Sequence, residues 1–332
     1  MKFNSEGLKN ITGIYGPSGH EEKVVAHIEK EIKDFVDEIS VDSLGNLIAR
    51  KKGQGPKVMI AGHMDQIGLM VTDVDDKGFV RFTNVGGIMV EVTIGQRFEF
   101  ADGRIGIVGK EEKQEIQKTR LEHLYLDIGA KSKEEALGWI AIGDICVYYS
   151  EYYETEHTAM ARCMDDRIGC FVMIEALKRL GKVENDCYFV FTVQEEVGTR
   201  GAKTSAYSIE PDIGLAVDIT LSGDTPEARR FAVSLHDGVA IKVRDNSLLS
   251  HPKVNDRLIA LCEDNKIKYQ MEVLEFGGTD AGAMSLTKEG VPASCLSIPT
   301  RYGHSDHEVI SKVDVEAAVQ LLVQSLERPF EI

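Results

Sequence analysis

The chain has 332 residues, of which 43% are hydrophobic and 28% charged, proportions ordinary for a globular enzyme with one large domain or two. Its 38 basic and 54 acidic side chains give a net charge of −16, which would repel nucleic acid. No apolar run approaches the ~20 residues that cross a bilayer, and the N-terminus lacks the apolar core of a secretory signal. The six cysteines form no Cys-x-x-Cys pair, so we expect reduced thiols and a cytoplasmic protein.

The N-terminal part of the chain predicts a helix followed by strands. Apolar residues at helical spacing indicate an amphipathic helix over Glu21–Ile32. A short strand broken by a turn is expected over 41–49. The apolar run from residue 57 predicts a buried strand that ends at His63 and Asp65.

From residue 67 to about 156 the pattern changes to short β-type runs separated by glycine and aspartate turns. The runs are Gly68–Val74, Gly78–Phe82, Arg97–Phe100, Ile105–Val108 and Asp144–Tyr149. Helical pattern is scarce here, apart from Lys133–Leu137. We therefore expect an all-β domain at 67–156, inserted into a discontinuous domain made of 1–66 and 157–332.

The α/β pattern then resumes and continues to the end of the chain. Expected elements are a helix over 165–180, a buried strand over 188–193, a strand over 213–218, a helix over 255–265, a strand over 291–298, and a final helix over 315–326 preceded by a capping box at Ser311 and Asp314. The fold class predicted is α/β, with a mostly parallel sheet sandwiched by helices and a small inserted all-β domain.

Ionisable residues stand where the predicted strands end. They are His63 with Asp65, Glu195 with Glu196, Asp218, and His304, while Asp165 and Asp166 precede a helix. In open α/β sheets, ligands bind beyond the carboxyl ends of the strands. Histidines together with carboxylates suit Zn²⁺, Co²⁺ or Mn²⁺, and so many acids could not all stay ionised without cations between them. The pattern therefore predicts two metal ions.

Each of these residues has an ordinary alternative role when it is taken alone. A lone histidine is more often a hydrogen-bonded core residue, an aspartate before a helix often caps it, and one at a strand end often forms a turn. His304 also competes with His307 nearby. Asp65 lies two residues beyond His63, on the same side of an extended chain, where it could orient the imidazole. The shared position at strand ends supports the site.

Six stretches carry a resemblance to a known family, and they run in the family's order. They are Ala61–Gly68, Cys163–Gly169, Gln194–Ala202, Val217–Thr220, Gly277–Gly282 and Arg301–Ser305. In these stretches the chain resembles the M42 family of metallo-aminopeptidases, which includes tetrahedral, deblocking and glutamyl aminopeptidases. The resemblance implies a dinuclear-metal exopeptidase that removes N-terminal residues from peptides.

The resemblance also implies roles for individual residues. One divalent metal ion would be held by His63 and Asp218 and the other by Glu196 and His304, with Asp165 bridging them; zinc or cobalt is expected first and manganese as an alternative. Glu195 would be the general base and Asp65 the carboxylate behind His63. A cis peptide bond between Asp165 and Asp166 is expected, as is a homo-oligomer, in the family a tetrahedral dodecamer assembled through the inserted domain.

Two other classes of function stay open at this point. Paired carboxylates also hydrolyse glycosides, as in an endoglucanase, although such enzymes rarely use histidine ligands and tend to line long clefts with aromatic residues. This chain has one tryptophan, Trp139, and 7% aromatic residues. The other class is a non-catalytic assembly protein on the same fold. The preferred N-terminal residue of a substrate is also open, since an acidic one would need a basic pocket that the sequence does not locate.

Overall fold

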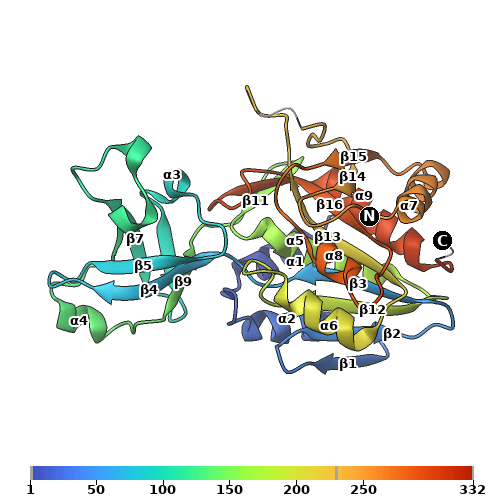
Figure 1. Cartoon of the computed structure of the whole chain (residues 1–332), viewed down its shortest axis with the longest axis horizontal. Helices are drawn as coiled ribbons and strands as arrows, with labels where there is room; N and C mark the ends of the chain where they lie inside the picture. Colours follow the sequence, from blue (N-terminus) through green and yellow to red (C-terminus); the bar gives the residue numbers. More distant parts are fainter. Residues whose placement is uncertain (1–2, 229–230, 331–332) are drawn as a thin grey trace.

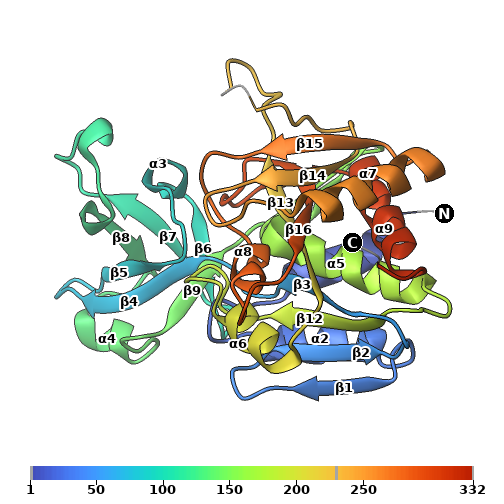
Figure 2. The same ribbon diagram turned by 45° about the vertical axis from the view of Figure 1, so that its right-hand side comes forward.

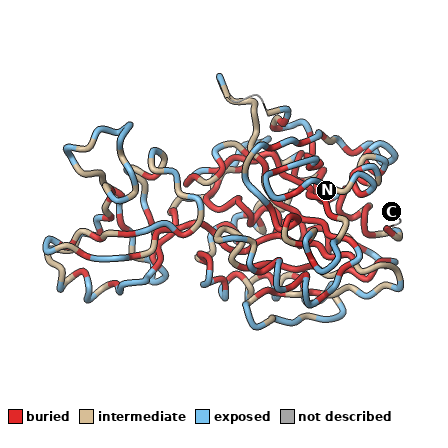
Figure 3. Tube along the Cα trace, viewed as in Figure 1, coloured by how far each residue is buried: buried red, intermediate tan, exposed pale blue. Residues whose placement is uncertain are grey.

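A computed structural model describes residues 3–228 and 231–330 of the chain. Its elements form a large α/β unit and a smaller β unit that projects from one side of it (Figure 1). Burial is densest in the middle of the large unit, as Figure 3 shows. Among the helices of the described residues, none has the length and apolarity that crossing a membrane requires.

The large unit is built on one mixed sheet. Its strands are β1 (Glu38–Val41), β2 (Leu47–Lys51), β3 (Lys57–His63), β10 (Tyr153–Glu154), β11 (Thr158–Ala161), β12 (Asp186–Thr192), β13 (Ile213–Leu221), β14 (Val239–Arg244), β15 (Tyr269–Val273), β16 (Ala293–Arg301) and β17 (Glu308–Ser311). The central order is β12-β3-β13-β16, and these neighbours run parallel. Antiparallel strands flank this centre, so the sheet is mostly parallel where it is most buried.

Helices cover both faces of this sheet (Figures 1 and 2). One face is covered by α1 (Ser5–Gly13), α2 (Glu22–Ile32), α5 (Met164–Arg179), α7 (Pro252–Asn265) and α9 (Lys312–Leu326), and the other by α6 (Arg200–Ile209) and α8 (Asp280–Ser285). Strand β3 shows why its sequence is apolar throughout: Val58 and Ile60 pack on the first face, Met59 and Ala61 on the second.

The smaller unit is a closed barrel inserted between β3 and α5. Its strands are β4 (Gly68–Val74), β5 (Val80–Val85), β6 (Arg97–Phe100), β7 (Ile105–Lys110), β8 (Leu124–Asp127) and β9 (Ile145–Tyr148), in the order β4-β5-β8-β7-β6-β9, with short helices α3 (Val90–Thr93), α4 (Lys133–Leu137), η1 (Ile116–Lys118) and η2 (Leu121–His123). Leu69, Phe98 and Leu126 lie in its core. Closure leaves no exposed sheet edge. The barrel strands all lie within 67–156, while β10 pairs with β11 in the large sheet.

The predicted fold class is confirmed, with differences in detail. The predicted strand over 41–49 is a hairpin, in which β1 and β2 pair on either side of the turn. The prediction of a capping box is wrong: the side chain of Ser311 makes no capping hydrogen bond to helix α9, and its Oγ lies 2.9 Å from Nδ1 of His236. The carboxylate of Asp314 instead accepts hydrogen bonds from the backbone N–H groups of His236 and Gly238. These donors, which are distant in the sequence, occupy the carboxylate of Asp314 in place of a local cap. The local sequence pattern therefore predicts a capping box that does not form.

Candidate metal centre

The parallel strands deliver the predicted residues to one edge of the sheet. The pairing register sets Thr192, the last residue of β12, beside His63, the last residue of β3. Glu195 and Glu196 follow three and four residues after Thr192. Asp218 lies on the neighbouring strand β13, which continues three residues beyond it to Leu221. Since parallel strands end on the same side, residues far apart in the sequence meet here.

Asp165 lies between the two histidines of this edge. Its Oδ1 is 3.1 Å from Nε2 of His63, and its Oδ2 is 3.1 Å from Nε2 of His304. The peptide bond between Asp165 and Asp166 is cis, as the family resemblance implied. His63 and Asp165 are both buried. One carboxylate therefore faces two imidazoles with its two oxygens, an arrangement suited to bridging two cations.

The other ring nitrogen of each histidine is already held. Nδ1 of His63 lies 3.1 Å from the backbone carbonyl oxygen of Asp65 and 3.5 Å from its Oδ1. Nδ1 of His304 lies 2.9 Å from the carbonyl oxygen of Gly87, which belongs to the barrel side of the chain. A proton held on Nδ1 by such an acceptor leaves Nε2 free as a ligand, and both Nε2 atoms point at Asp165.

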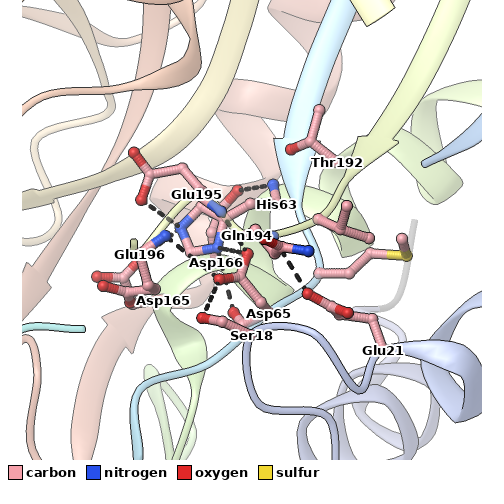
Figure 4. Close-up of polar contacts among 12 residues, drawn as sticks. Ser18, Glu21, His63, Asp65, Asp165, Asp166, Thr192, Gln194, Glu195 and Glu196 are labelled. Atoms are coloured by element: carbon pink, nitrogen blue, oxygen red, sulfur yellow. Dashed lines mark hydrogen bonds and ion pairs between the residues drawn. The ribbon is translucent and has the colours of Figure 1, made fainter. Parts of the chain in front are cut away.

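The adjacent glutamates face different histidines. Oε2 of Glu195 lies 3.9 Å from Nε2 of His63, whereas Oε2 of Glu196 lies 3.7 Å from Nε2 of His304. Their backbone N–H groups both donate to the carboxylate of Asp65, at 2.9 and 3.2 Å. Figure 4 shows Asp65 beneath His63 and the glutamate pair. Asp65 thus ties the imidazole to both glutamates.

The centre is electrostatically unbalanced in the absence of cations. Burial, reinforced by the charges of Asp218 and Asp280, raises the pKa of Glu195 well above its usual range. Burial likewise raises the pKa of Glu196 to about 7. Although burial opposes protonation of His304, the nearby carboxylates of Glu196 and Asp165 raise its pKa to about 11. Acids that bind protons so readily would release them to divalent cations, so this donor set fits metal ions.

Comparisons with known proteins identify the family of the chain. The sequence pattern of the M42 glutamyl aminopeptidase family matches residues 45–321. The chain belongs to this family. It is 51% identical over 320 residues to a putative aminopeptidase of Acetivibrio thermocellus, covering 96% of this chain and 97% of the relative. It is 35% identical to a lysyl aminopeptidase of Pyrococcus furiosus, covering 97% and 96% of the two chains.

Solved structures show the same fold. An aminopeptidase of the archaeon Desulfurococcus kamchatkensis is 39% identical, with a TM-score of 0.93 and coverage of 97% of this chain and 94% of that one. The PhTET1 structure, described as a dodecamer, is 33% identical, with a TM-score of 0.89 and full coverage of both chains. The chain is therefore an M42 aminopeptidase, a hydrolase of peptide bonds. Family membership favours this activity over a glycoside hydrolase or a non-catalytic assembly protein.

Two sets of ligand atoms in this aminopeptidase lie close enough to hold metal ions. One comprises His63, Asp165 and Glu196, and the other comprises His63, Asp166 and Asp218, each with its atoms within 4.8 Å of one another. Asp166 already accepts hydrogen bonds from the backbone N–H groups of His63 and Gly169. His304 adjoins the first set through Asp165. The structure therefore brings all five predicted ligands to one place.

Three residues at or beside the centre were not predicted from the sequence. The carboxylate of Glu308 accepts hydrogen bonds from the backbone N–H groups of both Asp165 (2.9 Å) and His304 (2.7 Å). Asp280 is buried and accepts a hydrogen bond from the hydroxyl of Thr192 at 2.5 Å. Asp280 lies in a family motif, which was a usable signal. Lys242 lines the cavity from β14, a strand that the sequence did not predict.

A cavity of about 540 Å³ opens onto the centre. Its apolar wall includes Leu274 and Phe276, while Gly87 and Met89 reach it from the side of the barrel. The cavity thus lies where the inserted barrel meets the large unit. It offers room for a peptide end beside the candidate metal ligands.

Proposed function

We propose that this aminopeptidase works with two divalent metal ions. The ligands would be His63 and Asp218 for one ion, Glu196 and His304 for the other, and Asp165 as the bridge. The observation that carries this proposal is the position of Asp165, whose two oxygens lie at equal distances of 3.1 Å from the two imidazoles. Nitrogen and carboxylate ligands without thiolates suit zinc or cobalt, and manganese is an alternative.

Bound metal ions of this kind supply a Lewis acid that polarises a scissile carbonyl and makes water a better nucleophile. Glu195 then acts as the general base: its partly exposed carboxylate, 3.9 Å from Nε2 of His63, accepts a proton from the attacking water and returns it to the leaving amine. Asp65 holds the imidazole of His63 in orientation. The acids of the centre attract the free α-amino group of the peptide, which confines cleavage to the first residue.

Metal analysis combined with a substrate pair tests this proposal. Purified protein should hold two zinc, cobalt or manganese ions per chain and release the first residue of a short peptide. The same peptide with an acetylated N-terminus should resist hydrolysis, because it cannot present an ammonium group to the acids. One ion per chain, or equal rates on the two peptides, would contradict the proposal.

The preferred first residue requires a substrate panel. The family is described by its glutamyl aminopeptidases, and one relative is a lysyl aminopeptidase, so related chains differ in preference. The cavity contributes Lys242 and the apolar side chains Leu274 and Phe276. Aminoacyl chromogenic substrates with acidic, basic and apolar first residues, tested with zinc and with cobalt, give the preference directly.

We also propose that copies of the chain assemble through the inserted domain of residues 67–156, as a dodecamer. Similar structures support this: PhTET1 is described as a dodecamer, and Pyrococcus horikoshii TET1 peptidase (34% identity, 98% and 99% coverage, TM-score 0.87) as a tetrahedron or a large octahedral shell. The barrel exposes Ile107, Ile116 and Ile142. Light scattering should give twelve times the mass of the chain.

Six buried free cysteines support a cytoplasmic location.

A further inference from the structure

The segment from Tyr15 to Glu21 reaches the metal centre, although the family pattern begins only at residue 45. Pro17 forms a parallel bridge with Gln66, whose N–H donates to the carbonyl of Gly16. The N–H of His20 donates to the carbonyl of Pro17 at 2.8 Å, which closes a β-turn. Gly19, at φ +88°, occupies the turn position that requires a left-handed backbone. This turn presents Ser18 to the centre.

Ser18 contacts the carboxylate that organises the glutamate pair. Its hydroxyl donates to Oδ2 of Asp65 at 2.6 Å. The same carboxylate accepts the N–H groups of Glu195 and Glu196, and its Oδ1 lies 3.5 Å from Nδ1 of His63. Figure 4 shows these contacts converging on Asp65. A hydroxyl donating to an ionised carboxylate forms a stronger bond than one between neutral groups, so Ser18 strongly fixes the orientation of Asp65.

Glu21 makes a second contact from the same segment. Its Oε1 accepts the N–H of Gly19 at 2.9 Å and the N–H of Gln194 at 3.1 Å. Gln194 immediately precedes Glu195 and has a left-handed backbone, at φ +56°. Glu21 is buried. It therefore joins the N-terminal turn to the backbone that carries the proposed general base.

Arg167 holds this segment in place. Its fully buried guanidinium donates to the carbonyls of Met64 at 2.5 Å, Ile11 at 2.8 Å and Gly16 at 3.4 Å. A side chain at Gly16 would meet Arg167 Nη2 at 2.8 Å, so close approach requires glycine there. The segment is thereby fastened to the end of β3 just before Asp65.

We propose that Ser18 and Glu21 are positioning residues for peptide hydrolysis. Ser18 fixes the carboxylate of Asp65, Glu21 fixes the backbone of Gln194, and together they set Glu195 and Glu196 against His63. This inference rests on the proposed metal-dependent function. It assigns the N-terminal turn a part in the reaction that its sequence position, outside the matched family pattern, does not suggest.

Substitutions of Ser18 provide the first test. Ser18→Ala should lower kcat about tenfold with little change in KM, and should weaken metal binding, measured by competition with a coloured chelator, by a similar factor. Ser18→Thr keeps the hydroxyl and should restore both. Ser325→Ala is the matched control: Ser325 is buried and donates to the carbonyl of Leu322 at 2.8 Å in helix α9, away from the centre. It should leave kcat and metal binding unchanged.

Substitutions of Glu21 provide an independent arm. Glu21→Gln keeps an oxygen acceptor for the two N–H groups and should retain kcat within about threefold. Glu21→Ala removes the acceptor and should lower kcat about tenfold. If both alanine variants fail to fold, the contacts are structural and the inference is overturned. It is also overturned if both variants match the wild type, or if Ser18→Thr and Glu21→Gln are as impaired as the alanine variants.

The wild type separates failure of this inference from failure of the proposed function. If the wild type binds no metal while it hydrolyses peptides, the proposed metal-dependent function is wrong, whatever the variants do. If the wild type binds two metal ions and Ser18→Ala has unchanged kcat and metal affinity, the proposed function stands and only the positioning role is lost.

Discussion

Two buried charge clusters lie in the same large unit, and they differ in how their charge is balanced. In the first, between β14 and β15, the ammonium of Lys242 contacts the carboxylate of Glu272 and lies 3.7 Å from Oδ2 of Asp245. The other oxygen of Asp245 accepts backbone N–H groups from Ser247 and Leu248. Glu272 outweighs the opposing effect of burial and raises the pKa of Lys242. This cluster carries its own counter-charge.

The candidate metal centre contains more carboxylates than the positively charged side chains of the chain neutralise. Burial raises the pKa of Asp218 well above its usual range, and the charge of Asp165 adds to this. Burial followed by the charge of Asp218 does the same for Asp166. The comparison teaches that burial alone does not mark a functional site. A buried cluster with its own cation needs no ligand for its charge, whereas one with excess negative charge is a candidate site for a cation from outside.

Metal removal should give the largest effect, because only the second cluster is proposed to bind cations from outside the chain. Treatment with a strong chelator should lower aminopeptidase turnover by about 10³-fold or more, and added zinc or cobalt should restore it. The rate of release of a chromogenic leaving group measures this. Aminopeptidase activity that persists after metal analysis shows complete removal would contradict the proposed dependence on metal ions.

Replacing the proposed general base should give the next largest effect. Glu195→Gln keeps the shape of the side chain but cannot accept a proton, so kcat should fall by about 10²- to 10⁴-fold. Metal content and the thermal unfolding midpoint should stay close to those of the wild type. Near-normal kcat would remove Glu195 from the base role, and loss of metal would make it a ligand instead.

Removing the cation from the balanced cluster should instead destabilise the fold. Lys242→Met leaves Glu272 buried without its partner, which should cost about 3–5 kcal/mol of unfolding free energy. Denaturant titration of the metal-free protein measures this. The double substitution with Glu272→Gln is the control and should recover part of the loss, because the side chain that contacted Lys242 is then neutral and only Asp245 keeps a charge, which backbone N–H groups stabilise. Additive losses in the double variant would show that the two residues do not depend on each other.

Neutralising a carboxylate of the candidate metal centre should raise, rather than lower, the unfolding free energy of the metal-free protein. A carboxyl whose pKa is raised by folding lowers stability at neutral pH, since its ionised form is less favourable in the folded state than in the unfolded state. Asp218→Asn should therefore raise the unfolding free energy of the metal-free protein by on the order of 1 kcal/mol. Metal affinity and turnover should fall. A metal-free variant less stable than the wild type would contradict this.

The difference between the clusters also explains what the sequence could predict. His63, Glu195 and Asp218 follow or lie in strongly apolar strands, and parallel strands bring such residues to one edge whatever the loops between them do. No such rule applies to the Lys242 cluster. It depends on the pairing of β14, whose first four residues are buried, with β15, in which buried and exposed positions alternate, and neither strand was predicted from the sequence.

Contacts between residues far apart in the sequence could not be predicted from it either. Glu308 supports the centre because the turn after β16 folds the chain back onto Asp165, and no local pattern encodes that contact. Closure of the barrel depends on the pairing of β6 with β9, whose residues are more than 40 positions apart. The sequence predicted an all-β insertion from turns and alternation, which are local. The strand order that makes it a barrel is not local.

The smallest expected effect comes from an ion pair that is about as short as the buried pairs but is partly exposed to water. Lys178 on α5 lies 2.7 Å from Glu31 on α2, and both side chains are partly exposed. Because water screens such a pair, Lys178→Met should lower the unfolding free energy at pH 7 by only about 0.2–1 kcal/mol.

The pH dependence of the stability loss in Lys178→Met tests whether the ion pair with Glu31 is its cause. The hydrogen bond from Lys178 holds the pKa of Glu31 below its usual range, so the pair stabilises the fold above that range and loses its effect as the pH falls through the lowered value. The difference between Lys178→Met and the wild type should therefore shrink in strong acid and in high salt. A loss as large as that for Lys242→Met, or one independent of both pH and salt, would mean that contact distance rather than burial decides what a charge pair contributes here.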